Sequence, residues 1–230
     1  MPEEKADCRE CGVEILATTA AKTGGKCIPC IRGTRAEMEE SRKRVAEERR
    51  LRKINDEARE RILRKGKPEL RDFLSEEDPL GVLWPVVLET VFPRPARRER
   101  IDALGHAAKV IYLVECLSGE VCNGGFHQFF SNSSGEHAQE AHSALLEVGA
   151  VKAAGLLERA MRALADGRVP TDRLERYNEL ELADKRHPGL FDGLDREFYS
   201  LETGAPVSED LGELLLAFMR RHASATVAAA

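Results

Sequence analysis

The chain has 230 residues and a formal net charge of −5, with 35 lysines and arginines against 40 aspartates and glutamates. Hydrophobic residues make up 42% of it, too many for a wholly disordered chain, and charged residues make up 33%, which is many for one compact domain. The sequence contains neither an apolar stretch long enough to cross a membrane nor the apolar centre of a secretory signal. We therefore expect a cytoplasmic protein with one or two domains.

The charge is distributed unevenly along the chain. Residues 1–33 carry equal numbers of acidic and basic groups, residues 34–67 have a net charge of +5, and residues 68–230 have a net charge of −10. These differences predict a small N-terminal module, a charged helical linker and an acidic domain over residues 68–222. The alanine-rich residues 223–230 are expected to form a disordered tail.

Four cysteines form two C-x-x-C pairs near the N-terminus, Cys8 with Cys11 and Cys27 with Cys30. Fifteen residues separate the two pairs, which is the spacing of a site in which four thiolates hold one zinc ion. Gly12 can adopt the left-handed conformation that turns the chain around a metal. Such a small unit buries little apolar surface, so the zinc would be structural and would supply folding free energy. Disulfides and a redox-active dithiol are the alternatives, although disulfides are uncommon in chains that lack a secretion signal.

This cysteine pattern resembles the small zinc-ribbon or treble-clef knuckles at the N-termini of many bacterial proteins. The resemblance implies a module that binds or positions, and we expect a short β-hairpin in it. Its basic residues could reach phosphate, but the equal number of acidic residues offsets them.

Residues 34 to 66 are predicted to form one long exposed helix. No glycine or proline interrupts the sequence between Gly33 and Gly66, and several acidic residues precede a basic residue by four positions, the order that stabilises a helix. The apolar residues form only a thin stripe, so we interpret the helix as a solvated spacer. A coiled-coil contact and a phosphate-binding surface are the alternatives.

From residue 68 to residue 222 the sequence predicts an all-helical domain, so the fold class of the chain is mainly α. Apolar residues recur every three to four positions over 80–91 and 96–119, and alternating runs rich in valine and isoleucine are missing. Further helices are expected over residues 136–148, 150–165, 171–185, 190–201 and 209–221.

The most distinctive sequence of this domain consists of Asn123, Gly124, Gly125, Phe126, His127, Gln128, Phe129, Phe130, Ser131, Asn132, Ser133, Ser134 and Gly135. Its Asn-Gly-Gly start predicts a sharp reversal of the chain, because glycine accepts positive φ angles. The spacing of its three phenylalanines places their rings on one helix face, where they would plug the core. We interpret the motif as a packing and turn element. A catalytic or ligand-binding loop is the alternative, but no carboxylate lies at a diagnostic spacing.

At these residues the chain resembles a bacterial family of domains of unknown function whose characterised member is a DNA-mimic protein. The block Glu120–Gly135 carries the resemblance, which continues through weaker patterns such as Leu194–Tyr199 over about residues 80–222. The resemblance implies an all-helical fold without an assigned activity. It also implies a surface on which carboxylates take the place of DNA phosphates and bind a DNA-binding protein.

Carboxylates for such a surface are concentrated in residues 175–213, which hold eleven acidic and four basic residues. The candidate partner-binding residues are Glu175, Glu179, Glu181, Asp184, Asp192, Asp195 and Glu197. An ordinary acidic surface that keeps the protein in solution is the alternative.

Together these patterns favour a non-enzymatic interaction protein whose acidic helical domain binds a basic protein, with a structural zinc module at its N-terminus. The first alternative is an adaptor that contacts nucleic acid through the zinc module and the basic helix. The second is an enzyme that uses the loop from Asn123 to Gly135.

Overall fold

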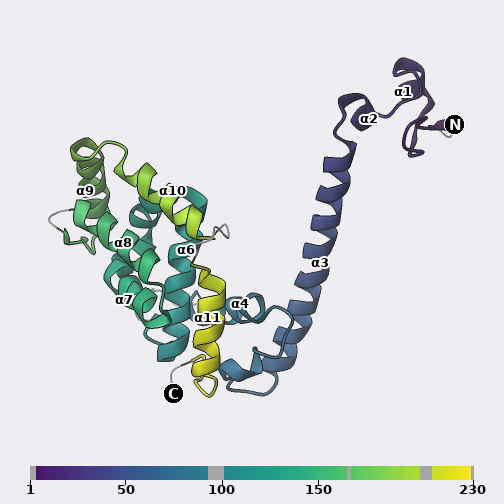
Figure 1. Cartoon of the computed structure of the whole chain (residues 1–230). Coiled ribbons are helices and arrows are strands. Elements are labelled where there is room, and N and C mark those ends of the chain that lie inside the picture. The colour runs from purple at the N-terminus through teal and green to yellow at the C-terminus, as the bar shows by residue number, and fades with distance from the viewer. Residues whose placement is uncertain (1–3, 93–100, 165–166, 203–208, 229–230) are drawn as a thin grey trace. The chain divides into compact units, whose positions relative to one another are not determined.

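The computed structural model of the chain describes residues 4–92, 101–164, 167–202 and 209–228 (Figure 1). It divides into two compact units, residues 1–54 and residues 55–230. The boundary falls inside the long helix α3 (Arg35–Leu63) rather than at residue 33 or 67, where the sequence suggests it. No helix in the described ranges is long and apolar enough to cross a membrane.

The first unit begins with a short antiparallel hairpin, as the sequence predicts. Strand β1 (Lys5–Asp7) pairs with β2 (Glu14–Leu16), and Ala6 lies opposite Ile15. Two short helices follow, α1 (Ala17–Lys22) and α2 (Ile28–Arg32). Helix α2 ends at Gly33, whose φ of 69° is left-handed, and α3 starts two residues later.

Helix α3 confirms the prediction of one long helix over this part of the chain. Ion pairs one turn apart line its exposed surface, among them Glu60 with Arg64 at 3.3 Å. The end of the helix has a different environment, because Ala58 and Ile62 are each 1% exposed and belong to the core of the second unit. The last turns of the predicted linker are therefore part of the helical domain.

The second unit is all-helical in its described residues, as predicted. It consists of η1 (Leu70–Asp72), α4 (Pro79–Val91), α6 (His106–Ser131), η2 (Ser133–His137), α7 (Ala138–Val148), α8 (Val151–Ala163), α9 (Arg173–Arg186), α10 (Leu190–Glu202) and α11 (Leu211–Arg221). Helix α6 is central, because α4, α7, α9, α10 and α11 all contact it (Figure 1). Residues 96–100, where the sequence predicts the first turns of this helix, lie outside the described ranges.

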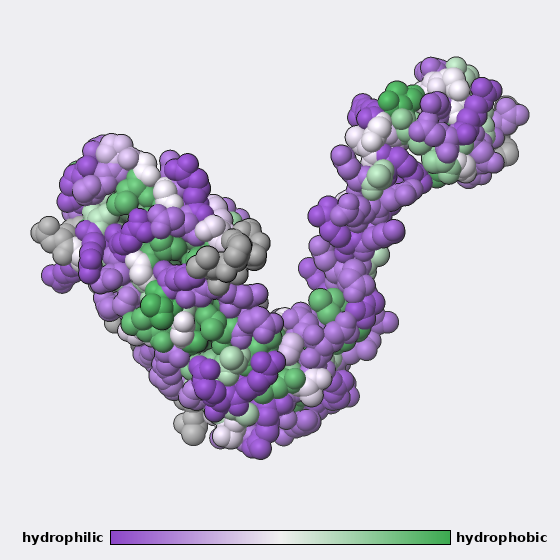
Figure 2. Space-filling view, in the orientation of Figure 1, coloured by the Kyte–Doolittle hydropathy of each residue, from purple (hydrophilic) through white to green (hydrophobic). Residues whose placement is uncertain are grey.

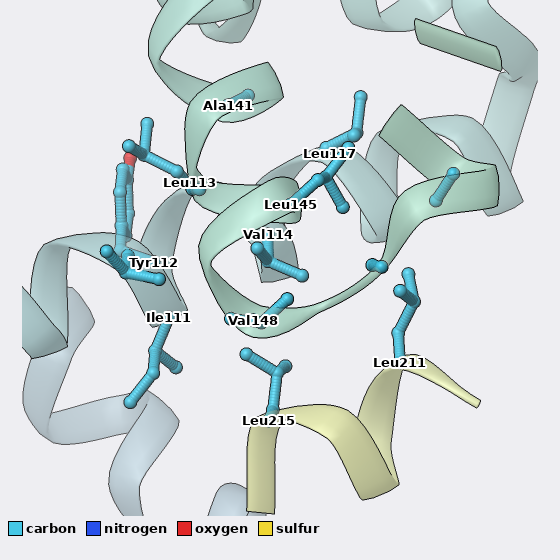
Figure 3. Packing of buried hydrophobic residues seen from close by; sticks show 14 of the residues in the cluster. Ile111, Tyr112, Leu113, Val114, Leu117, Ala141, Leu145, Val148, Leu211 and Leu215 are labelled. Carbon is cyan, nitrogen blue, oxygen red and sulfur yellow. The ribbon is translucent and has the colours of Figure 1, made fainter. Parts of the chain in front are cut away.

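Part of the core forms where α6, α7 and α11 meet. Figure 3 shows Val114 of α6, Val148 of α7 and Leu215 of α11 converging, and each of these side chains is at most 2% exposed. Burying a side chain of this size contributes about 1.5–3 kcal/mol. These contacts fix α6, and with it the Asn-Gly-Gly motif near its C-terminal end.

Residues 223–228 differ from the predicted disordered tail. The backbone N–H of Leu70 donates to the carbonyl of Ala225 at 2.9 Å, and the N–H of Gly105 donates to the carbonyl of Val227 at 2.9 Å. The side chain of Val227 is 1% exposed. One buried valine and a few backbone hydrogen bonds thus hold a segment whose alanine-rich composition predicts fraying. Residues 229–230 lie outside the described ranges.

Candidate functional site

The four predicted metal ligands meet in one cluster. Cys8 and Cys11 lie in the turn between β1 and β2, Cys27 directly precedes α2, and Cys30 lies within that helix. Their sulfur atoms are within 4.8 Å of one another, and the Sγ–Sγ distances are 3.9 Å for Cys8–Cys30 and 3.7 Å for Cys11–Cys27. Tetrahedral zinc with Zn–S bonds of about 2.3 Å requires sulfurs about 3.8 Å apart. The free thiols are therefore placed to hold a metal ion.

The chain around the cluster favours thiolate at one position and thiol at another. The backbone N–H of Cys27 donates to Sγ of Cys8 at 3.2 Å, and this hydrogen bond is the main reason why the pKa of the Cys8 thiol falls to about 6. Hydrogen bonding with Cys27, followed by burial, raises the pKa of the Cys30 thiol. Four sulfurs this close cannot all ionise without a cation, so binding a metal would displace protons from the cluster.

The Asn-Gly-Gly motif breaks α6 and turns the chain sharply, as predicted, so that residues before and after the break are hydrogen-bonded to each other. Gly124 and Gly125 have non-helical backbone angles, with a φ of 75° at Gly125, and the helix resumes at Phe126. The N–H of Phe126 donates to Oδ1 of Asp195 on α10 at 2.8 Å. A carboxylate from a distant helix therefore caps the second part of α6, as a side chain caps the start of a new helix.

Asp195 approaches this break so closely that only glycine fits there. A Cβ atom built on Gly125 would lie 2.1 Å from Oδ2 of Asp195. Burial raises the pKa of the Asp195 carboxyl above its ordinary value, and the hydrogen bond from Phe126 offsets only part of that rise. The structure thus places Asp195, a predicted partner-binding residue, in an internal helix cap.

A second carboxylate organises the polar half of the motif. Glu120, which lies just before the motif, accepts hydrogen bonds from Gln128 Nε2 at 2.7 Å, Asn132 Nδ2 at 2.8 Å and Ser134 Oγ at 2.7 Å. Gln128 also accepts a hydrogen bond from Asn123 Nδ2 at 3.1 Å. The amides and the hydroxyl that suggested a catalytic loop are therefore held by one carboxylate of the same chain.

The three phenylalanines of the motif plug the core, as predicted. Phe126, Phe129 and Phe130 are each at most 1% exposed. Phe126 packs edge-on against Phe198 with ring centroids 5.8 Å apart, and Phe130 packs against Phe191 at 6.4 Å. These contacts join the end of α6 to α10.

Arg176 of α9 is a structural residue that the sequence analysis missed. Its side chain is 0% exposed. It donates to four carbonyl oxygens, those of Phe130 at 2.6 Å, Asn132 at 2.7 Å, Pro170 at 2.8 Å and Thr171 at 3.1 Å. Burial lowers the pKa of the Arg176 guanidinium below its ordinary value, although arginine keeps its charge in proteins. Its spacing from Leu180 and Ala183 on the buried face of α9 is the sequence signal that could have identified it.

A family model described as DMP19-like protein matches residues 102–222. The match covers more than half of the chain and includes the Asn-Gly-Gly motif, Glu120, Arg176 and Asp195. The chain belongs to the DMP19-like family. Comparisons with curated proteins and with solved structures found no match. The capping and clamping network around the motif therefore lies entirely within the DMP19-like domain.

The sequence shows no carboxylate at a diagnostic spacing from the motif, but the folded DMP19-like domain brings one close to His127. Nε2 of His127 lies 3.4 Å from Oδ2 of Asp184, and Nδ1 of His127 lies 3.4 Å from Oγ of Ser131. Both distances exceed the roughly 2.6–3.2 Å of an activated nucleophile. The side chains of His127 and Asp184 are 40% and 44% exposed, and the neighbouring N–H of Phe126 is already bonded to Asp195. This geometry fits a surface contact better than an active site.

The other predicted partner-binding carboxylates fall into two groups. Glu197 pairs with Arg159 at 2.6 Å, and Glu179 lies 3.5 Å from Arg186. The remaining candidates form no ion pair with lysine or arginine within the described part of the chain: Glu175, Glu181, Asp184 and Asp192. Three of these four lie on α9 and one on α10.

Large apolar side chains interrupt the carboxylates on α9. This helix turns Arg176, Leu180 and Ala183 toward the core. Its solvent side carries Leu174, Tyr177 and Leu182, which are 69%, 44% and 48% exposed. The exposed side of α9 in the DMP19-like domain is therefore both acidic and apolar.

We expect Gly125→Ala to destabilise the DMP19-like domain by about 2–3 kcal/mol, because alanine resists the left-handed conformation and its Cβ would displace the Asp195 cap. Urea unfolding followed by the fluorescence of Trp84, the single tryptophan, measures the change. Gly119→Ala is the matched control on the same helix, since a Cβ there meets nothing within 4 Å. An unfolding midpoint that is the same in both variants would contradict the account of the motif.

Proposed function

We propose that this protein is a non-enzymatic interaction protein whose DMP19-like domain binds a basic protein, foremost a DNA-binding protein. Membership in a family of the DNA-mimic type supports the proposal. The main observation in its favour is that the polar groups of the motif are hydrogen-bonded to other residues of the same domain. Glu120, Asp195 and Arg176 hold them in caps and clamps, which leaves the motif a supporting role.

We assign partner binding to carboxylates of α9 and α10. Glu175, Glu181 and Asp192 have no ion pair with lysine or arginine within the described residues, so their charges are available to a partner. Duplex DNA presents a dense row of negative charges, and proteins that bind it carry matching lysine and arginine. Leu174 and Tyr177 add apolar anchors beside the carboxylates, and buried anchors of this kind contribute much of the affinity of protein interfaces.

We further propose that the cysteine cluster holds a structural zinc ion. Four thiolates that can surround one ion tetrahedrally favour zinc or iron. A metal bound by four protein ligands has no open coordination position for a substrate. The cysteines are free thiols, which suits the reducing cytoplasm, where we place the protein.

We expect Glu175→Lys, Glu181→Lys and Asp192→Lys together to abolish retention of basic proteins by the full-length chain. Like charges would then face the partner's lysines and arginines. The test immobilises the wild-type chain and the triple variant as paired baits in a bacterial lysate. Proteins released by a salt step are identified and compared by mass spectrometry.

A second triple variant, Glu60→Lys with Glu89→Lys and Glu213→Lys, is the matched control. It changes the net charge of the chain equally, but its substitutions lie on α3, α4 and α11. We expect this control to retain the same basic proteins as the wild type. If both variants lost the basic proteins equally, the net charge of the chain alone would explain binding. If all three baits retained them equally, the assignment to α9 and α10 would be refuted.

A further inference from the structure

A groove opens on the N-terminal module beside the cysteine cluster. Its volume is about 410 Å³, within the range of ligand-binding pockets. Val13, Ile15 and Leu16 line it from the hairpin, and Ile28 and Pro29 line it from α2. Figure 2 shows apolar areas interrupting the otherwise hydrophilic surface of this module.

The apolar side chains of the groove are not covered by the module itself. Leu16 and Ile28 are 39% and 44% exposed. Among the described residues of this unit, Cys8 and Cys27 are the only hydrophobic side chains that are fully buried. The module thus brings its aliphatic residues together without closing a core over them, an arrangement typical of an interaction site.

The edge of the groove is positively charged. Lys5, Arg35 and Arg42 line it together with one acidic residue, Glu14. Lys5 pairs with Glu14 at 2.7 Å and Arg35 with Glu39 at 2.6 Å, whereas exposed Arg42 has no ion pair within the described residues. A carboxylate at the edge would therefore meet a cation that forms no ion pair of its own among the described residues.

The composition of the module favours a peptide over a nucleic acid in this groove. Residues 1–54 contain no phenylalanine, tyrosine or tryptophan, so the module offers no aromatic ring on which a base could stack. Its aliphatic walls instead match aliphatic or aromatic side chains of a polypeptide.

We propose that this groove docks a segment of a partner protein that presents large apolar side chains next to carboxylates. The apolar side chains would cover Leu16 and Ile28, and a carboxylate would reach Arg42. The proposed ligand has the opposite charge to the partner of the DMP19-like domain, so this second site is independent of the function proposed above.

Selection of short random peptides displayed on phage tests the proposal, with the full-length, metal-loaded chain as bait. A parallel selection uses the double variant Leu16→Ser with Ile28→Ser, and metal content verifies that its cysteine site is intact. We expect the wild type to enrich peptides that combine apolar and acidic residues. These peptides should bind the double variant and Arg42→Glu at least roughly tenfold more weakly.

Enrichment of no peptide, or equal binding of the enriched peptides to wild type and to Arg42→Glu, would overturn the proposal. The Arg42→Glu variant decides the outcome if the double variant loses metal, because Arg42 lies on the exposed part of α3. The proposal would also be refuted if both baits enriched only peptides rich in lysine and arginine, to the same extent. That result would not contradict the function proposed for the DMP19-like domain.

Discussion

Cys27→Ser is expected to abolish metal binding and to unfold the N-terminal module while the helical domain stays folded. The module has little else to hold it, since its fully buried hydrophobic side chains in the described residues are Cys8 and Cys27 themselves. Structural zinc contributes on the order of 10 kcal/mol to modules of this kind. The folding free energy lost with one of the four ligands is therefore larger than the short hairpin and its few hydrogen bonds can supply.

Metal content per chain and amide hydrogen exchange measure this effect. The N–H groups of Cys8, Arg9 and Gly25 donate to backbone carbonyls within the module, so they should be protected in the wild type and exposed in Cys27→Ser. Cys122→Ser is the control, because Cys122 is exposed and lies outside the cluster. Protection that survives in Cys27→Ser would show that the module folds without the metal site.

Arg176→Met should destabilise the helical domain by about 3–5 kcal/mol, because an apolar side chain of similar length leaves the carbonyls that Arg176 clamps without a donor. An unpaired buried carbonyl costs about 1–3 kcal/mol, and methionine recovers part of the lost packing. The loss should appear as a lower urea midpoint in the fluorescence of Trp84, which packs against Tyr112 with ring centroids 5.9 Å apart.

Arg173→Met serves as the matched control for this clamp. Arg173 also lies on α9 and donates to a backbone carbonyl, that of Ser131 at 2.8 Å, but it does so from an exposed position. Solvent can replace such a bond, so we expect a change below about 1 kcal/mol. If both variants shifted the midpoint equally, burial of Arg176 would not be the source of its contribution.

Local patterns in the sequence predicted the features that depend on neighbouring residues. The spacing of the cysteine pairs predicted the cluster, and the acid-before-base order with no glycine predicted α3. The spacing of the phenylalanines predicted the buried face at the end of α6. The charge pairs and the phenylalanines each interact within about one helix turn, and the two cysteine pairs lie fifteen residues apart in one small module.

Contacts between distant segments account for what the sequence left open. The sequence predicted the turn at Asn123 but not its cap, because the capping residue, Asp195, is remote in the chain and approaches the backbone at Gly125. Arg176 was missed because two of its acceptors, the carbonyls of Phe130 and Asn132, lie more than forty residues away in the chain. The buried position of Val227 depends on backbone partners near residues 68 and 105. The spacing of residues along the sequence does not indicate such contacts. These contacts nevertheless determine which polar residues remain exposed to a partner.

We propose that carboxylates of α9 and α10 occupy the DNA-binding surface of a basic protein. The most direct test of this central claim adds duplex DNA to the wild-type bait after capture from the lysate. We predict that duplex DNA releases the retained basic proteins, and that the variant with lysine at Glu175, Glu181 and Asp192 retains none of them. Retention of the same proteins on both baits, undiminished by an excess of duplex DNA, would contradict the claim.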